Sequence, residues 1–391
     1  MRTIVIGGGI AGAAMAIALQ RTGHEVTVYE TYAVPPEQVG AHLGLAINGL
    51  RALEGLGLLK EVQAAGYPIE RMRFFTPRGN LVGDAPRLRR ETDSLRSVVI
   101  YRGHLVGILR RAAIDAGAKI VTGERMVNAS ESATGVSAEF ASGRTDTADL
   151  LVGADGIHST VRSLIDSSAP RAEYAGLYGV AGVSNMTGLE TGIWNLTYSR
   201  SGAFVHTTID ENTQWWAAQI GDPVKPDMRG IDDAEWLRRI TELFPEDMPQ
   251  AIIGSATAIV SSGYLSYLDP VRTWHTGRMV LVGDAAHPVG VGHGASVSLE
   301  DSLELAAALS NAPTVPAALQ AFDAARRPRI ERLLKHGNNA RETKRPSAMR
   351  RQIDLAKMRL VLPFFDKVQG YMYDYQPPAL PAVGKPQSAR H

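Results

Sequence analysis

Residues 3–12 read Thr-Ile-Val-Ile-Gly-Gly-Gly-Ile-Ala-Gly, a short apolar run that leads directly into a glycine turn. The apolar run predicts a strand, and the residues that follow predict a helix over 10–21 and a second strand over 25–30. This order of strand, tight turn, helix and strand is one β-α-β unit, and it indicates an α/β fold built on a parallel sheet.

The glycines of this turn predict a dinucleotide site. Gly7 permits the sharp turn out of the strand, Gly9 lets the backbone approach a pyrophosphate, and Gly12 lets helix and strand pack closely. The first helical residues, Ile10 and Ala11, direct the partial positive charge of the helix start toward the phosphates. A tight turn without a ligand is the alternative, and the complete β-α-β context disfavours it.

Glu30 identifies the kind of dinucleotide. It ends the second strand, where a carboxylate accepts hydrogen bonds from a ribose 2′-hydroxyl. A carboxylate at this position opposes a 2′-phosphate, so the site suits FAD or NAD rather than NADP.

Two more glycine turns carry an aspartate after an apolar strand. They read Gly153-Ala154-Asp155-Gly156 and Gly283-Asp284-Ala285-Ala286-His287. Taken alone, each could be a turn in which the aspartate caps a helix. Together with the first turn, and in this order, they indicate one long cofactor that contacts the chain at three distant points. FAD is long enough to do so.

Composition excludes several other classes of protein. The 41 Lys and Arg against 40 Asp and Glu give a formal charge of +1, which does not favour a nucleic acid, membrane or acidic partner. The chain has no cysteine, so disulfides and thiolate metal sites are excluded, and no other metal spacing occurs. With no apolar leader after Met1, we expect a cytoplasmic protein without a membrane span.

The expected organisation is a GR2-type Rossmann-like FAD-binding domain into which an antiparallel β-sheet substrate domain is inserted. Tryptophan-rich alternating stretches mark the insert, and apolar periodicity marks helices on either side of it. Helices are expected over 43–66, 102–116, 296–310, 315–340 and 348–362, and a hairpin within 124–152. The expected boundaries are 1–170 and 269–345 for the FAD-binding domain, 171–268 for the substrate domain, and 346–391 for a C-terminal helix and Pro-rich tail.

Three further segments complete a family pattern. They are Arg102-Gly-His-Leu-Val-Gly-Ile-Leu109, Gly292-His-Gly-Ala-Ser-Val-Ser-Leu-Glu-Asp-Ser302 and Phe322-Asp-Ala-Ala-Arg-Arg-Pro-Arg329. With the three glycine motifs, the chain resembles the group A FAD-dependent aromatic-ring monooxygenases, the p-hydroxybenzoate hydroxylase-like superfamily. The resemblance covers residues 1 to about 345. The basic cluster near Arg326 is interpreted as a solvated helix face or an interdomain contact.

The resemblance implies a role for each matching residue. Glu30 would bind the adenosine ribose and Arg102 the pyrophosphate region. Asp284 would bind the ribityl chain or the flavin-side phosphate, and Asp155 would serve both FAD and the nicotinamide cofactor. No second complete glycine fingerprint exists, which agrees with transient use of NADH or NADPH.

The loop that opens at Gly292 has a physical logic of its own. The free N–H groups of Gly294, Ala295 and Ser296, with the helix dipole, would face the N1/C2 edge of the flavin. There they would stabilise the negative charge of the reduced ring. His293 and Ser296 stand where the family has Gln and Asn, and the preceding loop is shorter and lacks a proline. His293 is one candidate catalytic residue.

The substrate site is less legible. His206 is a candidate to polarise or deprotonate a phenol because an ordinary histidine titrates near neutral pH; a structural histidine is the alternative. The candidate substrate contacts are Tyr178, Trp194, Trp216 and Gln219, each of which could equally be sheet core. Alternation along 214–220 does not say which face of the sheet lines the pocket.

The implied reaction is hydroxylation of an aromatic or polycyclic small molecule with NAD(P)H and O2, through a flavin C4a-hydroperoxide. Two alternatives stay open: an FAD-dependent oxidoreductase of the same fold that inserts no oxygen, and a non-catalytic FAD- or ligand-binding protein. Either a monomer or a homodimer fits the sequence.

Overall fold

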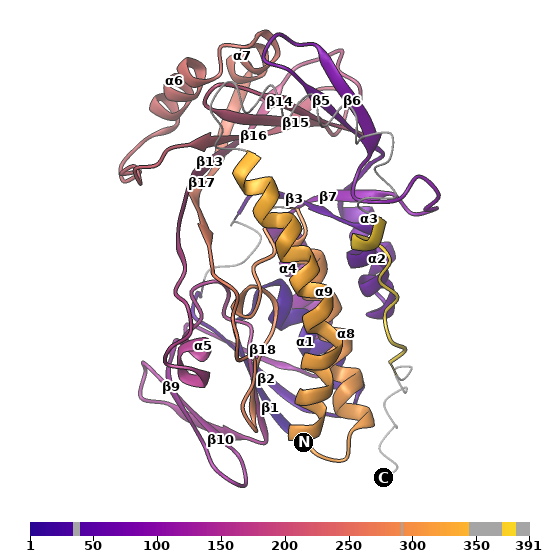
Figure 1. Ribbon diagram of the computed structural model, residues 1–391, viewed down its shortest axis with the longest axis vertical. Helices are drawn as coiled ribbons and strands as arrows, with labels where there is room; N and C mark the ends of the chain where they lie inside the picture. The colour runs from indigo at the N-terminus through magenta and orange to yellow at the C-terminus, as the bar shows by residue number, and fades with distance from the viewer. Residues whose placement is uncertain (34–39, 291, 344–369, 381–391) are drawn as a thin grey trace.

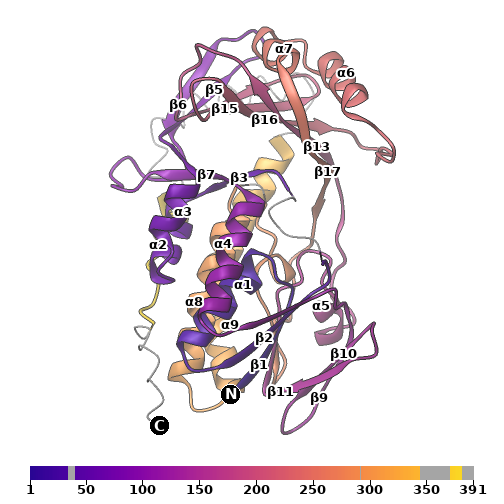
Figure 2. The same ribbon diagram turned by 180° about the vertical axis from the view of Figure 1, so that it is seen from behind.

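The computed structural model describes residues 1–33, 40–290, 292–343 and 370–380 (Figure 1). A parallel sheet with helices packed beside it forms one end of the molecule, and a larger sheet capped by two short helices forms the other (Figures 1 and 2). Two long strands, β13 (Glu173–Asn185) and β17 (Ala256–Tyr267), run from one end to the other. Over the described ranges, every helix is too short or too polar to span a membrane.

The parallel sheet carries the glycine motifs. Its five strands, in spatial order, are β18 (Met279–Leu281), β12 (Leu150–Gly153), β1 (Arg2–Ile6), β2 (Glu25–Glu30) and β8 (Lys119–Thr122). The helices α1 (Ile10–Arg21), α4 (Arg102–Asp115) and α8 (Gly294–Asn311) share one apolar core with this sheet. Because Ile6 pairs with Gly153 and Gly153 with Leu281 in parallel register, all three glycine motifs leave the same edge of the sheet.

The larger sheet has seven strands. Its order is β17, β13, β16 (Thr213–Gly221), β15 (Gly202–Thr208), β14 (Ile193–Tyr198), β5 (Arg71–Phe75) and β6 (Leu81–Pro86). The helices α6 (Asp233–Leu243) and α7 (Asp247–Gly254) cover its outer face (Figure 2). The inner face is turned toward the rest of the molecule (Figure 2): Trp215 of β16 stacks on His42, the first residue of β3 (His42–Leu45), with ring centres 3.7 Å apart.

The structure differs in detail from the expected organisation. Strands β5 and β6 lie within the expected first domain but belong to the seven-stranded sheet, and β5 pairs with β14 in parallel, so the sheet is not wholly antiparallel. The expected helix over 43–66 is instead β3 (His42–Leu45), α2 (Ile47–Gly55) and α3 (Leu59–Ala65). Gly57, at φ 77°, supplies the turn that separates the two helices.

The remaining elements match expectation more closely. A three-stranded sheet of β9 (Met126–Glu131), β10 (Val136–Phe140) and β11 (Thr145–Ala148) contains the expected hairpin. A second small sheet joins β3, β7 (Ser97–Tyr101) and β4 (Tyr67–Ile69). The short α5 (Thr160–Ile165), the 3-10 turns η2 (Gly283–Ala285) and η4 (Gly370–Met372), and the long α9 (Val315–Thr343) complete the described chain. The helix expected over 348–362 and most of the tail lie outside the described residues.

Candidate active site

The glycine motifs pack against one another at the edge of the parallel sheet. A Cβ at Gly7 would lie 2.4 Å from the carbonyl oxygen of Ala154, and one at Gly12 would lie 1.8 Å from that of Gly7. A Cβ at Gly283 would approach the Cβ of Ala11 at 3.0 Å. Since real Cβ contacts are wider, only glycine permits these approaches, and the packing role expected for Gly12 is visible in the structure.

The start of α1 offers free hydrogen-bond donors. The N–H of Ala13 is the first to bond within the helix, to the carbonyl of Gly9, so Ile10, Ala11 and Gly12 keep free N–H groups. Gly9 supplies no capping side chain, and a Cβ there would meet nothing within 4 Å. This combination of free donors and open space fits a pyrophosphate.

Glu30 lies beside this turn and also holds it in place. Its Oε2 accepts the N–H of Gly8 at 2.8 Å and a guanidinium N–H of Arg110 at 3.2 Å. Arg110 of α4 also donates to the carbonyl of Gly8 at 2.6 Å. Our sequence reasoning missed Arg110; its signal is a spacing of two helical turns from Arg102 on the same helix.

Asp155 caps the short helix α5. Its carboxylate accepts the Ser159 hydroxyl at 2.5 Å and the N–H groups of Thr160 and Val161 at 2.7 and 3.1 Å. Burial nevertheless raises the pKa of Asp155 against these hydrogen bonds. The capping alternative therefore describes what this side chain does in the structure, and its expected cofactor role stays a prediction.

Asp284 has the opposite surroundings. Solvent reaches its side chain, and among the described residues it has no hydrogen-bond or ion-pair partner. Protein still surrounds the carboxylate closely enough for desolvation to raise its pKa, opposed by the charges of His287 and Arg102. The Cα of Gly294 is close as well, because a Cβ there would lie 3.3 Å from Oδ1 of Asp284.

The start of α8 lies beside Asp284. The first intrahelical bond is from Val297 to His293, so the backbone N–H groups of Gly294, Ala295 and Ser296 have no acceptor among the described residues. The side chain of Ser296, however, is fully buried and accepts the N–H of Ala46 at 3.0 Å. Gly294 and Ala295 are partly exposed, so their backbone N–H groups, and not those of Ser296, are accessible to a cofactor.

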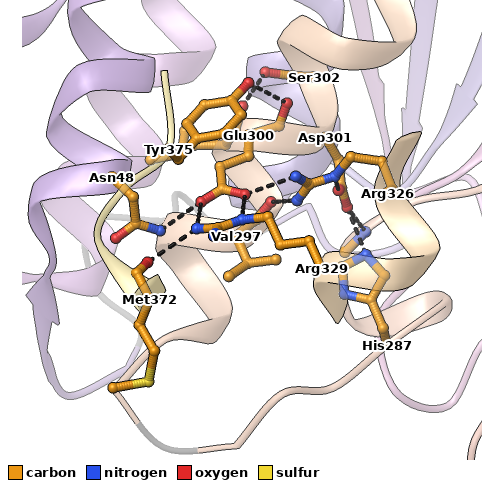
Figure 3. Close-up of polar contacts among 12 residues, drawn as sticks. Asn48, His287, Val297, Glu300, Asp301, Ser302, Arg326, Arg329, Met372 and Tyr375 are labelled. Carbon is orange, nitrogen blue, oxygen red and sulfur yellow. Dashed lines mark hydrogen bonds and ion pairs between the residues drawn. The ribbon is translucent and has the colours of Figure 1, made fainter. Parts of the chain in front are cut away.

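Behind this edge lies a cluster of charged residues that are buried, except for the partly exposed Arg329. We call it the ionic cluster, and its members are His287, Glu300, Asp301, Arg326 and Arg329 (Figure 3). Arg326 contacts Asp301 at 2.8 Å and Glu300 at 2.7 Å, and Glu300 also binds Arg329 at 2.6 Å. Asp301 accepts the N–H of Gly283 and a ring nitrogen of His287, each at 2.8 Å. The cluster therefore fixes the third glycine turn.

The ionic cluster corrects one interpretation. Arg326 is 1% exposed, so this part of the basic segment is not a solvated helix face. Because of His287 and Arg326, the pKa of Asp301 falls to about 2 despite burial, and the two carboxylates raise the pKa of Arg326. Arg329 also donates to the carbonyls of Tyr371 and Met372, so the cluster anchors the C-terminal segment (Figure 3).

The seven-stranded sheet divides the candidate substrate contacts. On β16 the outward residues are buried beneath α6 and α7, whereas Trp215, Ala217 and Gln219 are half-buried on the inner face. Trp194 packs with this inner face as well. Tyr178 and Trp216 lie in the outer core. Trp194 and Gln219 are thus placed toward the glycine motifs, and Tyr178 and Trp216 are placed away from them.

His206 lies on the outer face too. It pairs across the strands with Trp216, is 5% exposed, and lines a cavity of about 940 Å³ beside the loop that leads into α7. Burial lowers its pKa to about 4, so the ring is neutral at pH 7. The structure therefore places His206 on the face of the sheet opposite to Trp215 and Gln219, and its catalytic role stays a prediction. His293 remains at the start of α8, with its ring 6.2 Å from that of Tyr373.

Comparison with known proteins agrees with this geometry. The model of the FAD binding domain family matches residues 1–336. The aurachin C monooxygenase/isomerase of Stigmatella aurantiaca is 30% identical, covering 83% of this chain and 85% of the relative. The 3-amino-4-hydroxybenzoate 2-monooxygenase PtnB3 of Streptomyces platensis is also 30% identical, covering 84% and 85%. Among solved structures, Klebsiella pneumoniae HpxO complexed with FAD and uric acid superposes with a TM-score of 0.82 at 21% identity, covering 96% of each chain.

The chain therefore belongs to the FAD binding domain family. Within that family it is an FAD-dependent monooxygenase of the p-hydroxybenzoate hydroxylase-like superfamily, an enzyme class that hydroxylates aromatic compounds. The expected family, fold class and flavin cofactor are confirmed.

Proposed function

We propose that this enzyme uses NADH or NADPH and O2 to hydroxylate an aromatic small molecule held between the glycine motifs and the inner face of the seven-stranded sheet. The observation that supports this most is that two helix starts and Asp284 meet at one sheet edge, where their N–H groups and carboxylate have no hydrogen-bond partner among the described residues. Opposite them, Trp215, Ala217 and Gln219 form a half-buried surface suited to a flat ring.

The residues at the first glycine turn would hold the adenine half of the cofactor. The free N–H groups of Ile10 and Ala11 would bind phosphate oxygens, and Gly9 leaves the space for their approach. Glu30 would accept hydrogen bonds from the ribose, with Arg110 keeping the carboxylate oriented. Arg102, exposed at the start of α4 and electrostatically coupled to Asp284, would neutralise the pyrophosphate.

The residues at the third glycine turn would hold the reactive half. Asp284 would accept hydrogen bonds from the ribityl hydroxyls, because its carboxylate has no hydrogen-bond donor among the described residues. The free N–H groups of Gly294 and Ala295 would stabilise negative charge on the pyrimidine edge of the ring, and His293 could hydrogen-bond nearby. Bound FAD supplies the redox and oxygen chemistry, while these residues bind, orient and exclude water.

The substrate is best described as a planar aromatic compound. One compared relative is named for 3-amino-4-hydroxybenzoate, and Trp194 and Gln219 offer this chain an aromatic surface and an amide on the inner face. A cytoplasmic location and a monomeric or homodimeric state remain our expectations from the sequence.

The decisive experiment combines a flavin spectrum, NAD(P)H oxidation and isotope labelling. We expect the purified protein to carry FAD, to oxidise NADH or NADPH faster when a substrate is added, and to transfer one atom of ¹⁸O2 to the product. Product formation without the label would favour an oxidoreductase that inserts no oxygen. Bound FAD without any substrate-stimulated oxidation, across phenols, polycyclic polyketides and N-heteroaromatics, would favour a binding protein.

A further inference from the structure

The outer face of the seven-stranded sheet carries a cavity on the side away from the glycine motifs. The apolar core beneath α6 and α7 involves β13, β15 and β16, and no described residue of β14 or β5 belongs to it. Above β5, β14 and β15 lies the cavity of about 940 Å³ that His206 lines. The start of α7 forms one of its walls, and the turn that joins β5 to β6 forms another.

Strand register brings three polar side chains together at the base of this cavity. Asn195 of β14 pairs with His206 of β15 on one side and with Arg73 of β5 on the other. Thr197, two residues further along β14, lies on the same face because side chains alternate along a strand. Asn195, Thr197 and His206 therefore line one surface of the cavity.

These three side chains have no hydrogen-bond partner among the described residues. His206 is 5% exposed and Thr197 is 4% exposed, and Nδ1 of His206 is fully buried. Buried polar groups in proteins are nearly always hydrogen-bonded, and leaving one without a partner is unfavourable. The base of the cavity thus offers hydrogen bonds that the described chain does not use.

The walls around this base are mainly apolar and have an open entrance. Their apolar residues include Phe75, Pro245, Met248, Pro249 and Ala251. The rim at Gly79 and Gly188 carries no side chain, and a Cβ at either residue would meet nothing within 4 Å. An apolar cavity with a few convergent polar groups is the usual form of a small-molecule site.

The charges that line the cavity balance one another. Three arginines and three acids contribute, namely Arg73, Arg78, Arg200, Glu190, Glu246 and Asp247. Arg73 and Glu190 already contact each other at 2.6 Å. His206 adds no charge at pH 7, because burial lowers its pKa to about 4. A charged ligand would therefore lose its hydration without meeting a net opposite charge, and a neutral ligand is favoured.

We propose that this cavity is a second ligand site of the enzyme, which binds a neutral aromatic molecule that carries a hydroxyl group. The inference goes beyond the proposed function, which places its substrate at the inner face of the sheet. A neutral imidazole has one nitrogen that donates and one that accepts, and a hydroxyl does both, so the hydroxyl matches His206 in either tautomer. The apolar walls suit the ring, and Asn195 and Thr197 lie beside His206 to bind further polar groups of the ligand.

The test locates a bromine-labelled probe on the FAD-bound enzyme. The neutral probe is 6-bromo-2-naphthol, and 6-bromo-2-naphthoate is its anionic counterpart. Calorimetry gives Kd for both, and anomalous scattering from the bromine places each of them in soaked crystals. We expect the naphthol to occupy the cavity and to bind there about tenfold or more tightly than the naphthoate, because only the anion must give up the hydration of a charge.

Three variants identify the site in solution. Ala251→Trp fills the cavity from an exposed position on α7, so it should abolish naphthol binding there. Ala234→Trp is the matched control, because it makes the same change at an exposed position on α6 that does not line the cavity, and it should leave binding unchanged. His206→Leu removes the ring nitrogens and keeps a side chain of similar size, so it should weaken binding by about threefold to tenfold.

The proposal is overturned if the bromine appears only beside the glycine motifs or nowhere, or if Ala251→Trp still binds the naphthol in the cavity. Equal affinity of the cavity for naphthol and naphthoate overturns it as well. A naphthol found in crystals and undetected by calorimetry is binding at crystal concentration only, which also contradicts the proposal. FAD content and urea unfolding show whether the tryptophan variants are folded; if Ala251→Trp is not, unchanged naphthol affinity in His206→Leu decides against the site.

Discussion

The ionic cluster and the edge that faces the inner sheet use the same residue types in opposite ways. In the cluster, Asp301 and Arg326 neutralise each other, and the pKa of Asp301 falls to about 2. At the edge, Asp284 and Arg87, a buried arginine beside Trp194 of the inner face, have no charged partner in contact among the described residues, and desolvation shifts both pKa values toward the neutral forms. Charged groups that are paired within the protein stabilise the fold, whereas charged groups without a partner in the protein are available to bind a ligand.

The largest expected loss of stability comes from removing an arginine of the ionic cluster. Arg326→Met would leave the carboxylates of Glu300 and Asp301 buried without their main cation, and removing one partner of a buried pair costs about 3–5 kcal/mol. Urea unfolding of the FAD-bound enzyme measures the loss. The control is Arg327→Met next to it, which removes a partly exposed pair with Asp323 and should cost below about 1 kcal/mol. Equal losses in the two variants would contradict our view of the cluster.

His206 is a third kind of buried titratable group, one that is neutral because burial lowers its pKa. Its pKa of about 4 lies below the unfolded value of about 6.5, so the unfolded chain binds more protons between those values. Stability should therefore fall as pH drops through this window, and at pH 5 His206 should account for about 2 kcal/mol of the loss.

In His206→Leu that share of the acid sensitivity should disappear, as judged by urea unfolding at pH 7 and pH 5. Hydroxylation at pH 7 should change by less than about twofold, because the side chain lies across the sheet from the glycine motifs. A large fall in kcat with unchanged stability would support the catalytic role predicted for His206.

Asp284 tests the role of the charged groups that have no partner among the described residues. Asp284→Ala should weaken FAD binding by about tenfold or more, because FAD loses a charged hydrogen-bond acceptor that the protein supplies. The protein core should stay intact because Asp284 is exposed. Fluorescence titration of the apoprotein gives the Kd, and Asp166→Ala, which removes a partly exposed carboxylate that protein donors already satisfy, serves as control. A fully flavinated, fully active Asp284→Ala enzyme would exclude the role proposed for this carboxylate.

The smallest effect has the opposite sign. Arg87→Met removes a buried charge that lacks a protein partner, so we expect the substrate-free enzyme to become more stable by about 1 kcal/mol. Urea unfolding beside Arg326→Met makes the comparison direct, because both changes delete a buried guanidinium. A loss of several kcal/mol in Arg87→Met would show that Arg87 is scaffold.

Local backbone rules predicted the fold and the meeting of the three glycine turns at one edge of the parallel sheet. Gly7, Gly12 and Gly283 each lie where other atoms come too close for a side chain. Because this turn geometry imposes the same steric limit in any protein, the glycines can be recognised from the sequence. Strand and helix periodicity likewise placed α1 and α8 within a few residues of their observed ends.

Tertiary contacts explain what the sequence did not reveal. The face of β16 that is buried depends on α6 and α7, and alternation is the same for either choice, so Trp216 and Gln219 were indistinguishable. The partners of Arg326 lie 25 and 26 residues earlier in the chain, and nothing in its local sequence distinguishes it from a surface arginine. Arg87 was missed for the same reason: its lack of a partner is visible only in three dimensions.

The order of strands in the parallel sheet also determines when, during synthesis of the chain, the sheet can be completed. β1 leaves the ribosome first, yet its neighbour β12 and the next strand, β18, come from the middle and the last third of the chain. The turn at Gly283 further requires Asp301. At about 5–20 residues per second, a ribosome needs roughly 15–60 s to pass from the first motif to Asp301. Ala154, which packs against the first glycine turn, and Asp301, which holds the third, both emerge during that interval, so the sheet edge where the three turns meet is completed late in synthesis.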